Sequence, residues 1–178
     1  MTKTEARKLA KACRAAVDLH TVGHAMAGVL FTLPAWQHAD TVLAFASMPD
    51  EPDTADILRQ ALVEGKRLLL PRVLSRTEMD WVEITALSQL QPGAYGILEA
   101  PASLPAFDTA HLGDGALALI PCLAASPDGV RLGRGGGYYD RFLAHYKGRR
   151  LLVCPTAALL GDLPCEGWDV RFSPHEIL

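Results

Sequence analysis

The sequence lacks the features that mark several classes of protein. Its first residues, Met1 to Glu5, contain no apolar run of the kind found in a signal peptide. No window approaches the ~20 consecutive apolar residues that a membrane span requires. No stretch is dense in lysine or arginine, and the formal net charge is -3, so nucleic-acid binding has little electrostatic support. We therefore expect neither a membrane nor a nucleic-acid partner.

Cysteine is scarce, and its spacing is not that of a metal or disulfide site. The four cysteines, at positions 13, 122, 154 and 165, form no CxxC pair. Scattered free thiols suit a reducing compartment, so we expect a cytoplasmic protein. His20 and His24 have the i,i+4 spacing of a metal site on a helix, but Gly23 weakens that helix and no third ligand is apparent. A solvated histidine pair is the favoured interpretation.

Short, continuous apolar runs alternate with amphipathic segments. Such runs are typical of buried strands, and their alternation with helices favours a mainly parallel sheet covered on both faces. A chain of 178 residues suits one domain, residues 1–178, with a three-layer α/β/α fold. Residues 86–111, rich in Pro, Gly, Ala and Ser, are expected to be mostly loop. Strands are predicted at 41–46, 66–70 (ended by Pro71), 81–84, 116–121 and 151–154, and helices at 3–19, 24–33, 53–65 and 138–147.

The strongest chemical signal is the run RLGRGGGYYDR, residues 131–141, between a predicted strand and a predicted helix. Glycine lets a backbone approach a ligand closely, and a helix start offers unpaired N–H groups, so the turn is suited to phosphate. Arg131 and Arg134 can add charge-assisted hydrogen bonds, and Asp140 is placed to hold a magnesium ion that bridges phosphates. A flexible loop with solvated arginines is the alternative. The run is neither a Walker A loop nor a GxGxxG fingerprint.

This run resembles the signature of the 5-formyltetrahydrofolate cyclo-ligase family, also called methenyltetrahydrofolate synthetases. Weaker resemblance extends over nearly the whole chain in the expected order. It includes Lys3 and Arg7 in the first helix, Ser47-Met-Pro-Asp-Glu51-Pro-Asp-Thr54 after a strand, Gly65-Lys66, Leu98-Glu-Ala-Pro101, Leu119-Ile-Pro121 and Leu163-Pro-Cys-Glu-Gly-Trp-Asp169.

The resemblance implies a Rossmann-like fold of the NagB/RpiA/CoA-transferase-like type and a reaction that consumes ATP with Mg2+. ATP would phosphorylate the formyl oxygen of 5-formyltetrahydrofolate, and N10 would then attack. The products would be 5,10-methenyltetrahydrofolate, ADP and phosphate. Phosphoryl transfer depends on positioning and charge neutralisation more than on a protein nucleophile. The signature fits this demand, since it carries arginines, amides and a carboxylate but no Ser-His or Cys-His pair. We expect a monomer.

Site residues follow from the resemblance position by position. Lys3 and Arg7 would contact the ATP phosphates, Asp140 and Asp169 would bind magnesium, and Glu51 would hydrogen-bond the pterin. Arg134, Tyr139 and Asp140 would be the catalytic residues. The folate pocket would be lined by Ala46, Met48 and Tyr138, and the phosphate and substrate cradle would consist of Arg131, Gly133, Arg134, Gly135, Gly136, Gly137, Tyr138 and Tyr139.

Several of these residues have plainer interpretations without the resemblance. Lys3 and Arg7 would be the solvated face of an amphipathic helix, Glu51 a carboxylate at a helix start, and Asp169 a loop acid. The sequence also departs from the family pattern at 122–128 and 155–162. These departures leave open two alternatives: an enzyme of related fold that uses ATP or a sugar phosphate with a different acceptor, and a non-catalytic folate- or nucleotide-binding module.

Overall fold

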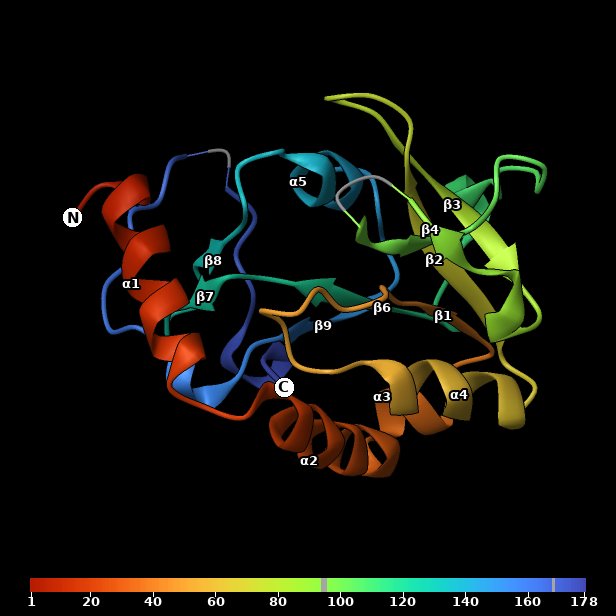
Figure 1. Cartoon of the computed structure of the whole chain (residues 1–178), viewed down its shortest axis with the longest axis horizontal. Coiled ribbons are helices and arrows are strands. Elements are labelled where there is room, and N and C mark those ends of the chain that lie inside the picture. Colours follow the sequence, from red (N-terminus) through yellow and green to blue (C-terminus); the bar gives the residue numbers. More distant parts are fainter. Residues whose placement is uncertain (94–95, 168) are drawn as a thin grey trace.

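A five-stranded sheet forms the centre of the computed structural model, which describes residues 1–93, 96–167 and 169–178 (Figure 1). The strand order is β3-β2-β1-β6-β9. Strands β1, β2, β6 and β9 are parallel, and β3 is an antiparallel edge strand paired with β2. The strands span Thr41–Leu43 (β1), Arg67–Val73 (β2), Met79–Ile84 (β3), Ala116–Pro121 (β6) and Arg149–Val153 (β9).

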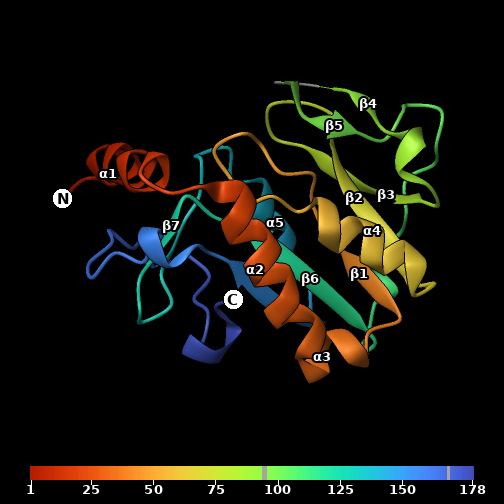
Figure 2. The ribbon, with the colours of Figure 1, turned by 60° about the horizontal axis from the view of Figure 1, so that its bottom comes forward.

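Helices cover the sheet on both faces, as Figures 1 and 2 show together. Helices α2 (Leu19–Thr32), α3 (Pro34–Gln37) and α4 (Ala55–Val63) lie on one face, and the short α5 (Tyr138–Leu143) lies on the other. Helix α1 (Lys3–Ala15) packs beside β8 (Arg131–Leu132) and the 3-10 helix η4 (Thr156–Ala158). The prediction of a three-layer, mainly parallel α/β fold is confirmed.

Alternation along the central strands builds two apolar cores. Successive side chains of a strand point to opposite faces, so Val42 enters the core beneath α2 and α4, whereas Leu43 enters the core beside α5. Leu68 and Leu69 of β2 divide between the same two cores. All four side chains are fully buried. This double burial explains why the strands are continuous apolar runs in the sequence.

The remaining elements are short. Two small antiparallel pairs, β4 with β5 and β7 with β8, flank the sheet, and 3-10 helices close several loops. They span Gln91–Pro92 (β4), Leu98–Glu99 (β5), Ala124–Ala125 (β7), Arg131–Leu132 (β8), Leu87–Gln89 (η1), Thr109–His111 (η3) and Pro174–Glu176 (η5). Within the described residues, the predicted loop at 86–111 contains four of these pieces, η1, β4, β5 and η3, and its residues 94 and 95 lie outside the described ranges.

Helix boundaries differ from the prediction where polar caps intervene. The predicted helix 3–19 ends at Ala15, because the Asp18 side chain accepts a hydrogen bond from the amide of His20 and starts α2 at Leu19. The predicted second helix, 24–33, is therefore five residues too short at its start. At the chain start, Thr2 and Glu5 form a capping box that fixes α1.

The prediction that Pro71 ends this strand is wrong, because β2 runs from Arg67 to Val73. Strand β2 continues to Val73 because it pairs with β3 on one side beyond the point, at Leu69, where its pairing with β1 stops. A proline is tolerated in a strand where one side has no ladder to complete. The extension places Val73 and the β2–β3 hairpin next to the pocket described below.

Candidate active site

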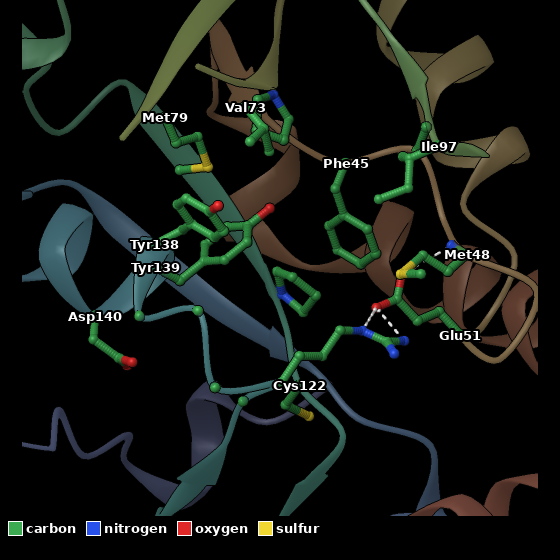
Figure 3. Close-up of a pocket in the computed structure, with 18 of the residues that line it drawn as sticks. Phe45, Met48, Glu51, Val73, Met79, Ile97, Cys122, Tyr138, Tyr139 and Asp140 are labelled. Carbon is green, nitrogen blue, oxygen red and sulfur yellow. Dashed lines mark hydrogen bonds and ion pairs between the residues drawn. The ribbon is translucent and has the colours of Figure 1, made fainter. Parts of the chain in front are cut away.

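A cavity of about 660 Å³ opens at the carboxyl ends of β1, β2 and β6 (Figure 3). Ligands in open α/β sheets commonly bind at this edge. Glu51 and Met48 lie on one side of the cavity, and Tyr138, Tyr139 and Met79 lie on the other. The wall consists of Phe45, Ala46, Met48, Glu51, Pro71, Val73, Arg76, Met79, Ile97, Leu98, Glu99, Pro121, Cys122, Arg131, Gly133, Arg134, Gly135, Gly136, Gly137, Tyr138, Tyr139 and Asp140.

The glycine-rich turn takes backbone conformations that other residues rarely adopt. Gly135 has φ 102° and Gly137, which caps the start of α5, has φ 69°. Both values lie in the region that glycine enters without steric cost. Helix α5 has six residues and ends at Leu143, whereas the sequence indicated a helix to residue 147. The turn brings its backbone to the cavity wall at each of the four predicted glycines, Gly133 and residues 135–137.

Arg131 and Asp140 form one ion pair of the site. Arg131 Nη1 lies 2.9 Å from Asp140 Oδ1, and Arg131 Nε donates to the carbonyl oxygen of Pro121 at the end of β6. The Arg131 side chain is only 7% exposed, whereas that of Asp140 is 43% exposed. The arginine is thus fixed in the wall, and the carboxylate remains accessible to a ligand.

Arg134 is held by two carboxylates across the cavity mouth. Its Nη2 lies 2.9 Å from Glu51 Oε1, and its Nη1 donates to Asp50 Oδ2 at 3.1 Å. Burial raises the pKa of Asp50, but the Arg134 guanidinium outweighs burial and holds that pKa below its usual value. Burial alone would lower the pKa of Arg134. The hydrogen bonds and negative charges of Asp50 and Glu51 outweigh burial, so that the pKa of Arg134 is raised overall.

Glu51 is fixed on both of its oxygens. Oε1 accepts from Arg134, and Oε2 accepts from the amide of Met48 at 2.9 Å. The residue is only 7% exposed. Thr54 braces the same loop, because its Oγ1 donates to the carbonyl oxygen of Phe45 and accepts from the amide of Ser47. The loop therefore presents Ala46, Met48 and the Glu51 carboxylate to the cavity in one fixed arrangement.

The two tyrosines at the start of α5 face the cavity in different ways. Tyr139 packs edge-on against Trp81, with ring centroids 6.3 Å apart, and Arg131 lies 5.6 Å from its ring centroid. Burial, with a contribution from the Glu51 charge, raises the pKa of Tyr139, so its hydroxyl stays protonated. Tyr138 donates from its hydroxyl to the carbonyl oxygen of Ser75, in the β2–β3 hairpin, at 2.7 Å.

Lys3, Arg7 and Asp169 lie outside the cavity wall. Arg7 Nε donates to the carbonyl oxygen of Gly133 at 3.1 Å, so α1 contacts the back of the glycine-rich turn. Lys3 Nζ lies 3.0 Å from an oxygen of Asp169 and 3.0 Å from Glu166. Burial raises the pKa of Asp169, but hydrogen bonds from the Glu166 amide and Lys3 lower it overall. The roles predicted for these three residues remain predictions.

The carboxylates of the site fit a magnesium ion only in part. Within residues 1–93, 96–167 and 169–178, no group of three or more His, Cys, Asp or Glu side chains is arranged so that it could hold a metal ion. Asp140 offers an exposed carboxylate, while both oxygens of Asp169 accept hydrogen bonds from Lys3. Magnesium in phosphate-transfer sites is commonly held by one or two carboxylates together with substrate phosphates. Asp140 satisfies this pattern without a protein cage.

Several wall residues were missed by the sequence analysis. Phe45, Pro121 and Cys122 follow or end parallel strands, and Pro71 lies in β2 just past its parallel pairing with β1, so the rule that ligands bind at that edge would have found them. Arg76 on the β2–β3 hairpin carries no comparable signal. The others come from β3 or from β5 and the residue before it, whose positions depend on tertiary folding: Met79, Ile97, Leu98 and Glu99.

Arg14 supports the site from behind, a role that no local pattern in the sequence indicates. Its side chain is buried within α1 and donates to the carbonyl oxygens of Asp50 and Leu123 at 2.6 and 2.7 Å and to that of Cys122. A buried guanidinium with these partners joins the Glu51 loop to the segment after β6. It therefore fixes both sides of the cavity relative to α1.

The fold and site together define a small three-layer α/β protein with a phosphate-suited turn and a buried carboxylate facing one cavity. A family model described as the 5-formyltetrahydrofolate cyclo-ligase family matches residues 2–174. The chain belongs to this family, as the signature predicted, and the family is one of ATP-dependent ligases. In the described part of the chain, no helix is both long and apolar enough to cross a membrane.

Individual relatives agree with this assignment. The chain is 31% identical over 154 residues to the 5-formyltetrahydrofolate cyclo-ligase of Escherichia coli K12, covering 84% of each chain. It is 30% identical over 141 residues to that of Mycolicibacterium smegmatis, covering 75% of this chain and 71% of the relative. The solved 5,10-methenyltetrahydrofolate synthetase of Aquifex aeolicus superposes with a TM-score of 0.81 at 26% identity, covering 96% and 87% of the two chains.

Proposed function

We propose that this chain catalyses the ATP-dependent cyclisation of 5-formyltetrahydrofolate to 5,10-methenyltetrahydrofolate, with release of ADP and phosphate. One observation carries the proposal. The glycine-rich turn with Arg131 and Asp140 faces the same cavity as the buried Glu51 carboxylate. A phosphate donor and a pterin, whose N–H groups suit a carboxylate, would therefore meet in one site.

The proposed reaction has two steps. The formyl oxygen on N5 attacks the γ-phosphorus of ATP, and ADP leaves. N10 then attacks the formyl carbon, the bond from that carbon to the phosphorylated oxygen breaks, phosphate leaves, and N10 loses its proton. Neither step needs a protein nucleophile, and both need the reacting atoms held close with their negative charge compensated.

The proposed roles follow the positions of the side chains. Arg131 and Arg134 would compensate charge on the transferring phosphate, and Lys3 and Arg7 would approach the phosphates from behind the glycine-rich turn. The protonated hydroxyl of Tyr139 would donate a hydrogen bond within the cavity. Glu51, Ala46, Met48 and Tyr138 would contact the folate, and the backbone of Gly133, Gly135, Gly136 and Gly137 would line the phosphates.

Asp140 would hold Mg2+, which supplies charge neutralisation at the phosphates, with Asp169 as the second proposed ligand. Arg131 pairs with Asp140 and also lowers the pKa of Asp169 by its charge, so both carboxylates lie in the field of one fixed guanidinium. Asp140 reaches the cavity in the free protein, whereas Asp169 would first have to give up part of its pairing with Lys3.

We also propose that the protein acts as a single-domain, cytoplasmic monomer on small-molecule substrates. Two observations support this. The four cysteines are free thiols, as expected in a reducing compartment. The exposed large apolar side chains within the described residues are distributed over several segments of the chain: Met1, Leu9, Val29, Val63, Leu74, Leu98 and Leu159.

A direct assay tests the activity. Purified protein is mixed with 5-formyltetrahydrofolate and MgATP, and the near-ultraviolet absorbance of the methenyl product is followed beside an ATP-free control. We expect product only with ATP. ATP binding without product would indicate a different acceptor, and binding of both ligands without turnover would indicate a non-catalytic module.

A further inference from the structure

Arg76 differs from the other cations of the cavity wall. Arg131 pairs with Asp140, and Arg134 pairs with Asp50 and Glu51. Arg76 also lines the cavity, yet it makes no ion pair or side-chain hydrogen bond with any of the described residues. Its neighbour on the hairpin, Glu78, is turned to the Ser75 hydroxyl instead. A cation at a cavity mouth with no internal partner is available to an anionic group of a ligand.

The hairpin that carries Arg76 is fixed over the cavity rather than free to swing away. The hydroxyl of Tyr138, at the start of α5, donates to the carbonyl oxygen of Ser75 at 2.7 Å. Strands β2 and β3 pair from Leu68 with Ile84 up to Val73 with Met79, which brings the hairpin to the cavity rim. The position of residue 76 is thereby set by both its strands and the Tyr138 contact.

An apolar surface separates Arg76 from the charged end of the cavity. Figure 3 shows Val73 and Met79 beside Tyr138 and across the cavity from Glu51. Ile97 adds a further apolar side chain to the cavity wall, near Phe45 and Met48 in the same figure. Glu99 also lines this region, but its residue is only 8% exposed and its carboxylate packs against Gly93. A ligand spanning the cavity would meet a carboxylate, then apolar and aromatic side chains, and then the Arg76 cation.

We propose that Arg76 is a specificity-determining residue that binds the carboxylates of the folate's glutamyl group. The inference rests on the proposed function and assigns the orientation of its substrate: pterin at Glu51, aromatic ring along Val73 and Met79, and glutamyl end at Arg76. The chemistry matches along the whole length, because a 5-formyltetrahydrofolate carries N–H donors at one end, an aromatic ring in the middle and carboxylates at the other end.

The test compares two substrates that differ only in the glutamyl group, 5-formyltetrahydrofolate and 5-formyltetrahydropteroate. For Arg76→Gln, we expect the KM for the folate to rise roughly tenfold with kcat little changed, since a charged hydrogen-bonded contact is lost. The KM for the pteroate should be the same in both enzymes. Arg76→Lys should recover part of the lost affinity, because a charge is restored without the forked donors.

The outcomes are distinguishable. Equal effects on both substrates, or a rise in the KM for ATP instead, would overturn the assignment of Arg76. No turnover of either substrate by the unaltered protein would overturn the proposed function and the inference with it. Arg59→Gln is the matched control, because Arg59 is an exposed arginine on α4 outside the cavity wall. Its kinetics should match those of the unaltered enzyme for all substrates.

Discussion

The Arg134 guanidinium and the Glu51 carboxylate, 83 positions apart in the sequence, form an ion pair of 2.9 Å at the cavity mouth. Both residues have proposed ligands of their own, phosphate for Arg134 and pterin for Glu51. In the free protein, the Arg134 guanidinium and the Glu51 carboxylate bind one another instead of these ligands. If the proposed roles hold, binding of a pterin at Glu51 would compete with Arg134 for that carboxylate, and the two substrates would be coupled through this pair.

Glu51→Gln is expected to weaken folate binding more than ATP binding. The amide keeps the size of the side chain but loses the negative charge and one acceptor, so the KM for 5-formyltetrahydrofolate should rise about tenfold. The fold should lose about 1–3 kcal/mol, because the residue is buried and hydrogen-bonded on both oxygens. Initial-rate kinetics in both substrates and thermal unfolding measure the two effects.

Asp50→Asn is the control for this variant. It weakens the pairing of the same Arg134 but leaves Glu51 unchanged, and Asp50 does not line the cavity. Its effect on the folate KM should be clearly smaller. An unchanged folate KM in Glu51→Gln would remove Glu51 from the folate pocket.

Asp140→Asn is expected to abolish most turnover while the fold persists. The variant removes the accessible carboxylate proposed to hold magnesium, so kcat should fall by at least about a hundredfold. The side chain is 43% exposed, which limits the cost to stability. Turnover measured as a function of Mg2+ concentration should show weaker metal binding, so that excess metal partly restores the activity.

The matched control is Asp128→Asn. Asp128 is also an exposed aspartate paired with an arginine, Arg171 at 2.8 Å, but it lies outside the cavity wall. Its activity should stay near that of the unaltered protein. Near-normal activity in Asp140→Asn would contradict the proposed magnesium role.

The sheet and the turn were predictable because their signals are local. Strands buried on both faces, such as residues 116–121, are continuous apolar runs whatever surrounds them. Four glycines beside two arginines require no partner elsewhere in the chain to be recognised. The boundaries that failed depend on neighbours: β2 passes Pro71 because β3 continues its pairing, and α2 begins at Leu19 because Asp18 caps it.

The pairing within the site could not be predicted in the same way. Arg134 was assigned to phosphate and Glu51 to pterin, and nothing local indicates that they contact one another. Arg14 is one of several cations in the segment that forms α1, yet it is buried by contacts with residues over a hundred positions away. Such partners are set by how the sheet brings distant loops to one edge.

Gly129→Ala should be one of the most destabilising single changes in this chain. Gly129 has φ 86°, and a Cβ there would lie 1.6 Å from the carbonyl oxygen of Phe172. Strain and backbone displacement together should cost about 3 kcal/mol or more. Gly28→Ala is the matched control, because Gly28 lies within α2 with nothing within 4 Å of a Cβ. It should stabilise the fold by about 0.5–1 kcal/mol, and chemical denaturation distinguishes the two.

The last prediction concerns pH, through the contact between α2 and the loop before α4. His20 Nδ1 lies 2.7 Å from Asp53 Oδ2, and the hydrogen bond and charge of Asp53 raise the pKa of His20 above that of a free histidine. A raised pKa in the folded state means that folding is favoured by protonation. The stabilisation is fully present below pH ~6.5, the usual histidine value, and is lost as the pH rises through the higher folded value.

The comparison of Tm between the unaltered protein and His20→Gln at several pH values tests this sign. The unaltered protein should be the more stable at pH about 5.5, and the difference should shrink by pH about 8.5. High salt should reduce the difference at the lower pH, because the pair is exposed to solvent. His38→Gln removes an exposed imidazole without an ion pair among the described residues and serves as the control. A difference that grows with pH would contradict the assignment, since it would mean that the neutral imidazole, not the imidazolium, is stabilised by Asp53.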